Sequence, residues 1–437
     1  MRSFAVFLLL TASLAATVAC ASGGAAVTQP RAEAAAAAAR VPGSAATRAG
    51  IRRPQDVEGC TTSGSASFVG GGAGNVAGGL DSGVLEGSSN NACAEYTAIG
   101  GGEYNTIDSS SNYSLVAGGY NNQMSAQYAF IGGGGDNTVS GLSSVISGGS
   151  ANNVPASHGF VGGGQSNSVA SGADFGSIAG GENNTVSSEW GVIGGGYRNS
   201  ASGTGYAFIG AGLANAASGE GAVVTGGYGN KASAAWATIP GGYVNTASGT
   251  FSFAAGGRAQ ALHTGAFVWS DGSDGDGLLK STAAYQFLAR AAGGVTFWSN
   301  SAATVGVKLA PGSGTWASLS DRASKADVAR IDESGVLLKL AALPISTWSY
   351  VSERGVRHVG PMAQDFYAAF GVGEDDRHIT AIDENGVALA AIKAVHRENL
   401  RLRAQLAASR AADARQYRSL ASEIRRLRVV LEQLRTR

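Results

Sequence analysis

Charged residues are scarce in this sequence of 437 residues, at 14%, and the 31 Lys and Arg balance the 31 Asp and Glu. The formal net charge of zero excludes a whole-protein electrostatic attraction to nucleic acid or to an anionic membrane. Proline is also scarce, with 8 residues, and glycine does not recur at every third position, which excludes collagen. No Gly-Lys-Ser or Gly-Lys-Thr occurs, so a P-loop is absent.

Histidine is rare as well, with 5 residues, and none of them has partners at a metal-ligand spacing. Residues 270–277 are rich in aspartate, and one interpretation is that Asp271, Asp274 and Asp276 bind a calcium ion. Their spacing does not fit an EF-hand loop, so an acidic turn is the preferred interpretation. We therefore expect neither a metal nor a cofactor.

Glycine is abundant by contrast, with 67 residues, of which only 6 lie at or after Ser320. The chain therefore consists of two regions of different composition. With 14 Phe, 13 Tyr and 6 Trp it has apolar side chains to bury, which argues against simple disorder. This composition also argues against an ordinary enzyme with a single core.

The first residues are typical of a secretory signal, because Arg2 precedes an apolar run that fades into small residues at Cys20. Cleavage by an ordinary signal peptidase and lipidation of Cys20, which would tether the chain to a membrane, both remain open. Residues 1–20 are assigned to this signal and the Ala-rich residues 21–60 to a tether. We expect an exported protein, at the cell envelope or outer surface or secreted.

Two further cysteines, Cys60 and Cys93, are the number that one disulfide needs, and export permits a disulfide. The sequence does not show whether they come within reach of each other. A Cys60–Cys93 bridge is therefore a hypothesis.

From residue 61 to 260 one unit of about 15 residues recurs, with two apolar or small residues, a Gly-rich step and then Asn. Gly lies two positions after the second apolar residue in twelve of thirteen copies, and Asn lies six positions after it in twelve of thirteen. These anchors are Val69, Leu85, Ile99, Val116, Ile131, Ile146, Val161, Ile178, Ile193, Ile209, Val224, Ile239 and Ala254.

A unit this short cannot bury its own apolar pair, but stacked units bury all the pairs in one column. The sequence thus predicts a mostly β fold with a parallel β-roll or β-solenoid shaft. Gly permits a turn or a close backbone approach. The repeated Asn is expected to take a left-handed conformation at a turn, or to form a hydrogen-bonded ladder. Residues 261–319 alternate short apolar runs with turn residues and are predicted to form a β connector.

Segments such as residues 130–137 (Phe-Ile-Gly-Gly-Gly-Gly-Asp-Asn) and 237–242 (Ala-Thr-Ile-Pro-Gly-Gly) resemble the head repeats of trimeric autotransporter adhesins and similar repeats of phage tail fibres. The resemblance implies that three parallel β-rolls wind together, although the period here is 15 rather than 14. It makes a homotrimer the expected assembly, and a cell-surface or glycan ligand stays unidentified.

Four later blocks occur in order: residues 320–325 (Ser-Asp-Arg-Ala-Ser-Lys), 348–350 (Trp-Ser-Tyr), 357–365 (Arg-His-Val-Gly-Pro-Met-Ala-Gln-Asp) and 382–389 (Ile-Asp-Glu-Asn-Gly-Val-Ala-Leu). They resemble the C-terminal intramolecular chaperone of phage endosialidases and related fibres, a self-cleaving serine peptidase. The resemblance implies a domain at 320–388 that trimerises, aligns the shafts and then cuts once between Leu319 and Ser320. It implies no activity on external substrates.

The chemistry needs a base beside the serine, since a serine hydroxyl is a weak nucleophile, and a lysine amine serves when burial favours its neutral form. Ser320 is the expected nucleophile and Lys325 the expected base. A spacing of five does not align two residues on one helix face, so the segment must bend. His358 and Gln364 lie in the family signature and are expected near the site as supporting groups.

Residues 389–437 carry 12 basic and 4 acidic residues and an apolar heptad pattern, which predicts a coiled coil rather than a nucleic-acid-binding tail. The seam residues are Ile392, Val395, Asn399, Leu402 and Leu406, then Ser409, Asp413 and Gln416, then Leu420, Ile424, Leu427, Leu431 and Leu434. The alternative to self-cleavage is a structural adhesin or envelope lipoprotein whose tail is a permanent trimerisation plug.

Overall fold

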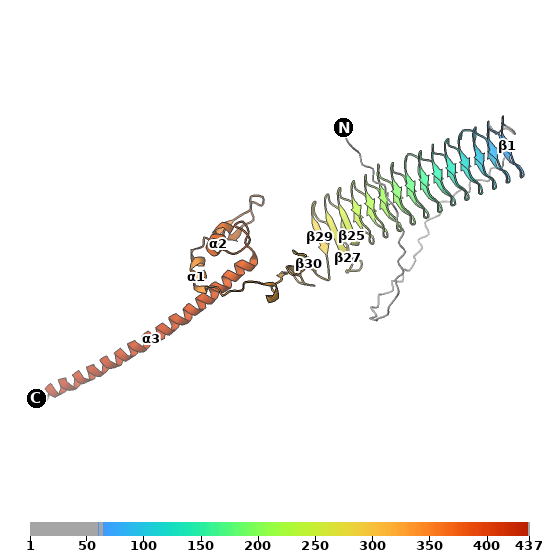
Figure 1. Cartoon of the computed structure of the whole chain (residues 1–437). Coiled ribbons are helices and arrows are strands. Elements are labelled where there is room, and N and C mark those ends of the chain that lie inside the picture. The colour runs from blue at the N-terminus through green and yellow to red at the C-terminus, as the bar shows by residue number, and fades with distance from the viewer. Residues whose placement is uncertain (1–59, 61–63, 436–437) are drawn as a thin grey trace, which may run out of the picture. The chain divides into compact units, whose positions relative to one another are not determined.

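The computed structural model describes residue 60 and residues 64–435, so the predicted signal and Cys20 lie outside the described residues. It divides into two units, Met1–Ala292 and Gly293–Arg437, which are described separately. In the first unit the chain coils so that short strands alternate between two parallel sheets (Figure 1). The predicted mostly β fold with a parallel β-solenoid is confirmed.

The first sheet, called sheet A, has 15 strands, nearly all two residues long. They are β1 (Phe68–Val69), β3 (Gly83–Val84), β5 (Ala98–Ile99), β7 (Leu115–Val116), β9 (Phe130–Ile131), β11 (Val145–Ile146), β13 (Phe160–Val161), β15 (Ser177–Ile178), β17 (Val192–Ile193), β19 (Phe208–Ile209), β21 (Val223–Val224), β23 (Thr238–Ile239), β25 (Phe253–Gly257), β27 (Phe267–Asp271) and β29 (Phe287–Arg290).

The second, sheet B, has 14 strands. They are β2 (Val76–Ala77), β4 (Asn91–Ala92), β6 (Thr106–Ile107), β8 (Gln123–Met124), β10 (Thr138–Val139), β12 (Asn153–Val154), β14 (Ser168–Val169), β16 (Thr185–Val186), β18 (Ser200–Ala201), β20 (Ala216–Ala217), β22 (Lys231–Ala232), β24 (Thr246–Ala247), β26 (Ala259–Ala261) and β28 (Leu279–Lys280). A row of single parallel bridges from Ala73 to Gly257 forms the third side of the coil.

The core of the solenoid is a column made by the second residue of each two-residue strand. Ile131 in sheet A, Val139 in sheet B and Ile146 in the next coil are all fully buried. Because side chains alternate across a strand, the first residue of each pair points outward. The predicted apolar column therefore holds the coils together, but it contains only one residue of each pair, and the expectation that both are buried in it is wrong.

One anchor was assigned to the wrong residue. Val84 is fully buried, whereas Leu85 is 59% exposed. The spacings are thus 15 residues from Val69 to Val84 and 15 residues from Val84 to Ile99, because β3 pairs Val84 with both of these residues. Leu85 follows an apolar residue in the sequence, which made it look like the inward member of the pair.

The repeated Asn residues form a continuous ladder inside the solenoid. Asn137 Nδ2 donates to Asn122 Oδ1 at 3.0 Å, and Asn137 Oδ1 accepts from Asn152 Nδ2 at 3.1 Å. Asn137 Nδ2 also donates to the carbonyl oxygens of Gly133 and Gly149. Each coil therefore satisfies the buried amide of its neighbour, as a hydrogen-bonded ladder predicts.

The expected left-handed conformation of the repeated Asn is wrong, because the residue before each of them takes it instead. Asp136, which precedes Asn137, has φ +56°. Gly134, three positions after the anchor Ile131, shows why this step is rich in glycine: it has φ +89°, and a Cβ there would overlap the Gly149 carbonyl of the next coil. The Gly step thus serves close backbone approach between coils.

The parallel sheets continue past residue 260, into the segment predicted as a connector. Ala254 in β25 pairs with Val268 in β27, and Val268 pairs with Leu288 in β29. The Gly and Asn signature is lost there, but a coil needs only an inward apolar residue and a turn. Residues up to Arg290 are therefore part of the solenoid sheets.

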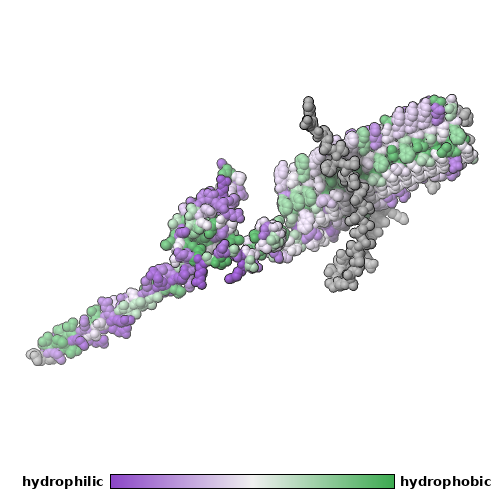
Figure 2. Space-filling model, viewed as in Figure 1, coloured by the Kyte–Doolittle hydropathy of each residue, from purple (hydrophilic) through white to green (hydrophobic). Residues whose placement is uncertain are grey.

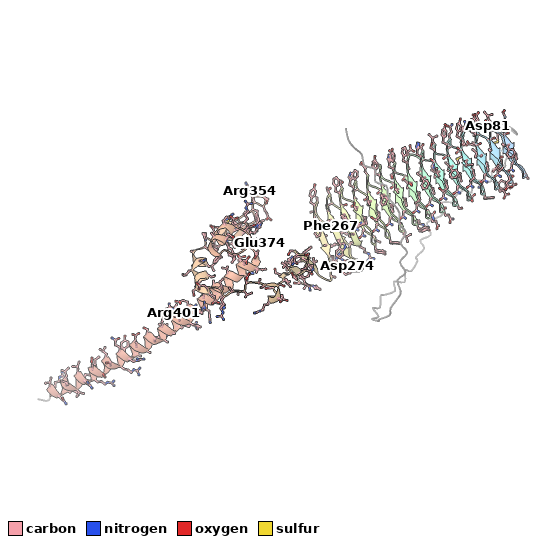
Figure 3. The ribbon with its side chains drawn as sticks, viewed as in Figure 1. Asp81, Phe267, Asp274, Arg354, Glu374 and Arg401 are labelled. Atoms are coloured by element: carbon pink, nitrogen blue, oxygen red, sulfur yellow. A yellow bond between two sulfur atoms is a disulfide. The ribbon has the colours of Figure 1, made fainter. Side chains whose placement is uncertain are left out.

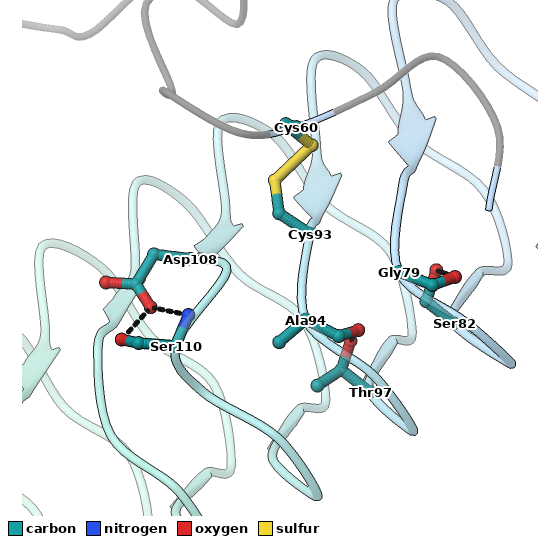
Figure 4. The surroundings of a disulfide bond; sticks show 8 residues. All are labelled: Cys60, Gly79, Ser82, Cys93, Ala94, Thr97, Asp108 and Ser110. Carbon is teal, nitrogen blue, oxygen red and sulfur yellow. Dashed lines mark hydrogen bonds between the residues drawn. A yellow bond between two sulfur atoms is a disulfide. The ribbon is translucent and has the colours of Figure 1, made fainter.

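A disulfide joins Cys60 to Cys93, next to β4 at the N-terminal end of the solenoid (Figure 4). In the next coil the Asp108 carboxylate accepts hydrogen bonds from the backbone and side chain of Ser110. The bridge ties the segment before the first coil to the array.

The second unit begins with an antiparallel sheet of β30 (Val295–Trp298), β31 (Gly306–Leu309) and β32 (Trp316–Ser318). It continues with the 3₁₀ turn η2 (Arg322–Ser324), α1 (Glu333–Ala342), the hairpin of β33 (Ser346–Trp348) and β34 (His358–Gly360), α2 (Ala363–Phe370) and α3 (Ala381–Arg435). The three α-helices enclose a small core that contains Val336, Phe366 and Val387.

Helix α3 is 55 residues long, and beyond Ala394 all its described residues are exposed. The seam residues Leu420, Leu427 and Leu434 are 53%, 63% and 68% exposed. The coiled coil remains a prediction. In the part of the chain described, no helix has the length and apolarity needed to cross a membrane.

Candidate active site

Ser320 and Lys325 are brought together by a single tight turn. Asp321 caps η2 by accepting a hydrogen bond from the Ala323 backbone at 2.9 Å, and the Lys325 backbone N–H donates to the Arg322 carbonyl at 3.2 Å. This reversal places Lys325 Nζ 2.7 Å from Ser320 Oγ, to which it donates. The segment bends as the spacing of five requires.

The residue before the serine is held in the sheet. The Leu319 backbone N–H donates to the Gly306 carbonyl at 3.1 Å, which extends β32 by one residue along β31. Leu319 also lines a hollow of about 360 Å³, together with Trp298, Val307 and Lys308. The Leu319–Ser320 bond thus lies where an ordered strand ends and the turn begins.

Both members of this pair are open to solvent, because Ser320 and Lys325 are exposed. A lysine accepts a proton only in its neutral form, which burial favours. In the single chain the pair therefore has the hydrogen-bond geometry for base-assisted attack but lacks a water-excluding environment.

His358 and Gln364 lie on other elements and make no hydrogen bond to Ser320 or Lys325 among the described residues. His358, in β34, packs its ring 4.7 Å from that of Trp348, its register partner in β33. His358 Nε2 and Trp348 Nε1 are buried without a hydrogen-bond partner. Gln364 is an exposed residue in the first turn of α2.

The sequence reasoning missed Glu333, the first residue of α1. Its carboxylate contacts Lys393 Nζ and Arg397 Nη2 of α3, each at 2.5 Å. The hydrogen bond from Lys393, together with the positive charge of Arg397, lowers the pKa of Glu333. Lys393 and Arg397 are four residues apart, so they share one helix face, but nothing local pointed to Glu333 as their partner.

Residues 320–372 match the family model of the chaperone of endosialidase. The second unit carries this chaperone domain. The match starts at Ser320, the residue that Lys325 contacts, and ends just after α2, so it leaves α3 outside. No curated protein matches the chain.

The acidic turn of residues 270–277 lies outside the chaperone domain. Asp274 pairs with Arg290 and Asp276 with Arg258, while Asp271 accepts from the backbone of Ala292. Figure 3 labels Asp274 near the C-terminal end of the solenoid. No group of residues with metal-ligand geometry occurs in the described chain. The aspartates are thus engaged with arginines and backbone rather than gathered around a common point.

Proposed function

We propose that this protein is an exported fibre whose C-terminal chaperone domain assembles three chains, aligns their solenoids and then cuts itself off between Leu319 and Ser320. The observation that carries the proposal is the 2.7 Å contact between Lys325 Nζ and Ser320 Oγ, at the first residue of the family match. The solenoid supplies the fibre and the chaperone domain supplies the assembly function.

The reaction proceeds in two steps. Lys325 takes the proton of the Ser320 hydroxyl, and Oγ attacks the carbonyl carbon of Leu319. The C–N bond then breaks, the α-amine of Ser320 leaves with a proton, and an ester joins Leu319 to Oγ. Water hydrolyses this ester, which releases the Leu319 carboxylate and restores the hydroxyl.

Assembly precedes the cut in this proposal, because the exposed pair needs burial before the lysine is an effective base. Packing of further chains around residues 319–325 would supply it. Cleavage would then be restricted to chains that have already assembled.

Assembly solves a problem of register. All coils of the solenoid are alike, so a slip of one coil between chains buries nearly the same surface. Winding of such non-local strands is slow and error-prone, and a trimerising helix raises the local concentration of the chains. Loss of the chaperone afterwards would leave the fibre kinetically trapped.

Export is supported by the signal-like pattern of residues 1–20 and by the disulfide between Cys60 and Cys93, which suits an oxidising compartment. Whether Cys20 carries a lipid decides between an envelope-tethered and a released fibre.

The test is the intact mass of the purified chain beside Ser320→Ala and Lys325→Ala, with Ser324→Ala in the same turn as the matched control. The expected result is a fragment that begins at Ser320 in wild type and in Ser324→Ala only. A full-length mass in every sample would refute self-cleavage and favour the permanent trimerisation plug.

A further inference from the structure

The two sheets of the solenoid share one backbone geometry but present opposite surfaces. The outward residues of sheet B are mostly polar: Asn91, Thr106, Gln123, Thr138, Asn153, Ser168, Thr185, Ser200, Lys231, Thr246, Gln260 and Lys280, with Val76 and Ala216 as exceptions. Those of sheet A are mostly apolar: Phe68, Ala98, Leu115, Phe130, Val145, Phe160, Val192, Phe208, Val223, Phe253, Phe267 and Phe287, with Gly83, Ser177 and Thr238 as exceptions. Strand propensity does not account for this difference, since both sets lie in short parallel strands.

A second apolar column runs beside the outward residues of sheet A. It lies two residues earlier in each coil, at a corner with positive φ, and contains Tyr96, Tyr113, Tyr128, His158, Phe175, Trp190, Tyr206, Trp236, Phe251 and Tyr285, with Ser143, Gly221 and Gly265 as exceptions. A left-handed conformation is unfavourable for bulky residues. Their repeated occurrence there requires a compensating interaction. The two columns together, over residues 96–287, are called the apolar stripe.

The apolar stripe is too large for the surface of an isolated protein. Ten of its aromatic residues are 38–66% exposed: Tyr96, Tyr113, Tyr128, Phe160, Phe175, Trp190, Tyr206, Phe208, Trp236 and Phe251. At ~200 Å² per aromatic side chain they expose roughly 1,000 Å², against ~300–600 Å² for the largest patch of a monomer. A standard protein interface needs ~800 Å² from each partner. Figure 2 shows apolar side chains gathered in a band along the solenoid.

The aromatic rings favour a protein occupant over a sugar. Tyr96, Tyr113 and Tyr128 stack face to face at 5.0 and 5.2 Å, and Phe175 stacks on Trp190 at 4.1 Å. A sugar ring binds on an exposed aromatic face, and within these stacks the faces cover one another. The outward edges of these stacked rings form apolar surfaces suited to contact with other side chains.

The charge distribution makes the apolar stripe the face on which a second copy of this chain meets the least repulsion. Residues 64–292 hold 13 acidic and 5 basic residues, a net charge of −8, so two solenoids repel each other over most of their surface. The apolar stripe contains no Asp, Glu, Lys or Arg, and it runs along the repeats for their whole length from residue 96. An identical solenoid in register offers an apolar partner of the same length and spacing.

We propose that the apolar stripe is the face through which the solenoids of neighbouring copies pack in the assembled fibre. This rests on the proposed trimeric assembly and adds which face is buried. Sheet B then faces solvent, in agreement with its polar outward residues.

The test compares two single cysteines in full-length protein that also carries Cys20→Ser: Phe208→Cys in the apolar stripe and Lys231→Cys on sheet B. Both positions are exposed in the single chain. In the native assembly, maleimide should label Phe208→Cys at least about tenfold more slowly than Lys231→Cys, because labelling requires the interface to open. Both should label equally after denaturation.

The native mass of each sample tests whether the chain forms a trimer, and the labelling rates test which face of the solenoid is buried in it. A trimer in which both cysteines label equally fast overturns the apolar stripe as the interface and leaves the trimer standing. A monomeric wild type refutes the trimer and the interface together. As a second variant, Phe208→Glu should lower the melting temperature of the assembly, and Lys231→Glu should not.

Discussion

In the solenoid, the second residue of every two-residue strand from β3 to β24 is buried within its own chain, whereas no described residue of α3 after Ala394 is buried. The solenoid therefore closes its core coil by coil without a partner. After Ala394 the helix has only an exposed apolar seam, which predicts pairing with other chains. The difference separates a region that completes its own core from one that, in the proposed assembly, joins the chains.

Breaking the seam should have the largest effect. We expect Leu420→Asp with Leu427→Asp to abolish assembly, because each buried Leu contributes about 1.5–3 kcal/mol and the loss recurs in every copy. Since self-cleavage is proposed to follow assembly, the cut at Ser320 should disappear as well. Sedimentation and intact mass measure both outcomes.

The control for the seam carries the same new charges away from it, as Ala411→Asp with Ser422→Asp. These changes should leave the sedimentation of the assembly unchanged. If the control also fails to assemble, then added negative charge anywhere in α3 prevents assembly, and the seam is not specifically required.

Breaking the Asn ladder should lower the stability of the solenoid, and this effect does not depend on contacts with another chain. Asn137→Ala removes the side-chain bonds to Asn122 Oδ1 and Asn152 Nδ2, and it leaves the buried Asn152 backbone N–H, which donates to Asn137 Oδ1, without that partner. We expect a loss of about 3 kcal/mol or more, since each buried unsatisfied group costs ~1–3 kcal/mol. Denaturant unfolding measures it. Asn153→Ala, on the outward face of the next coil, should stay within about 0.5 kcal/mol of wild type.

The smallest expected effect is a pH dependence in the second unit. The pKa of Glu333 is lowered, first by the hydrogen bond from Lys393. A lowered carboxyl pKa adds stability above its unfolded value, about 4.5, and that stability is lost as pH falls through the folded value. Attachment of α1 to α3 should therefore weaken in acid.

Hydrogen exchange of the α1 backbone at pH 7 and pH 4 measures this attachment. Glu333→Gln should exchange faster than wild type at pH 7 and show a smaller change between the two pH values. Glu353→Gln, in the loop between β33 and β34, should behave as wild type. Equal exchange in all three proteins would contradict a role for the Glu333 contacts.

Much of this organisation was predictable from local patterns. The 15-residue period, the recurrent Gly and the recurrent Asn predicted a stacked parallel array, because such residues serve turns and close approach wherever they occur. The blocks from Ser320 predicted the chaperone domain, and the family match begins at the same residue. The error at Leu85 arose because adjacent apolar residues do not show which one points inward.

What the sequence by itself determined was the repeat, the residue types at its corners and the separation of Ser320 from Lys325. These follow from chemistry within a few residues. Tertiary structure decided that Asn137 bonds to Asn122 and Asn152, that Glu333 holds α3, and that η2 turns Lys325 back to Ser320. Such contacts depend on how coils stack and where the chain reverses, and these arrangements are settled only when distant segments pack together.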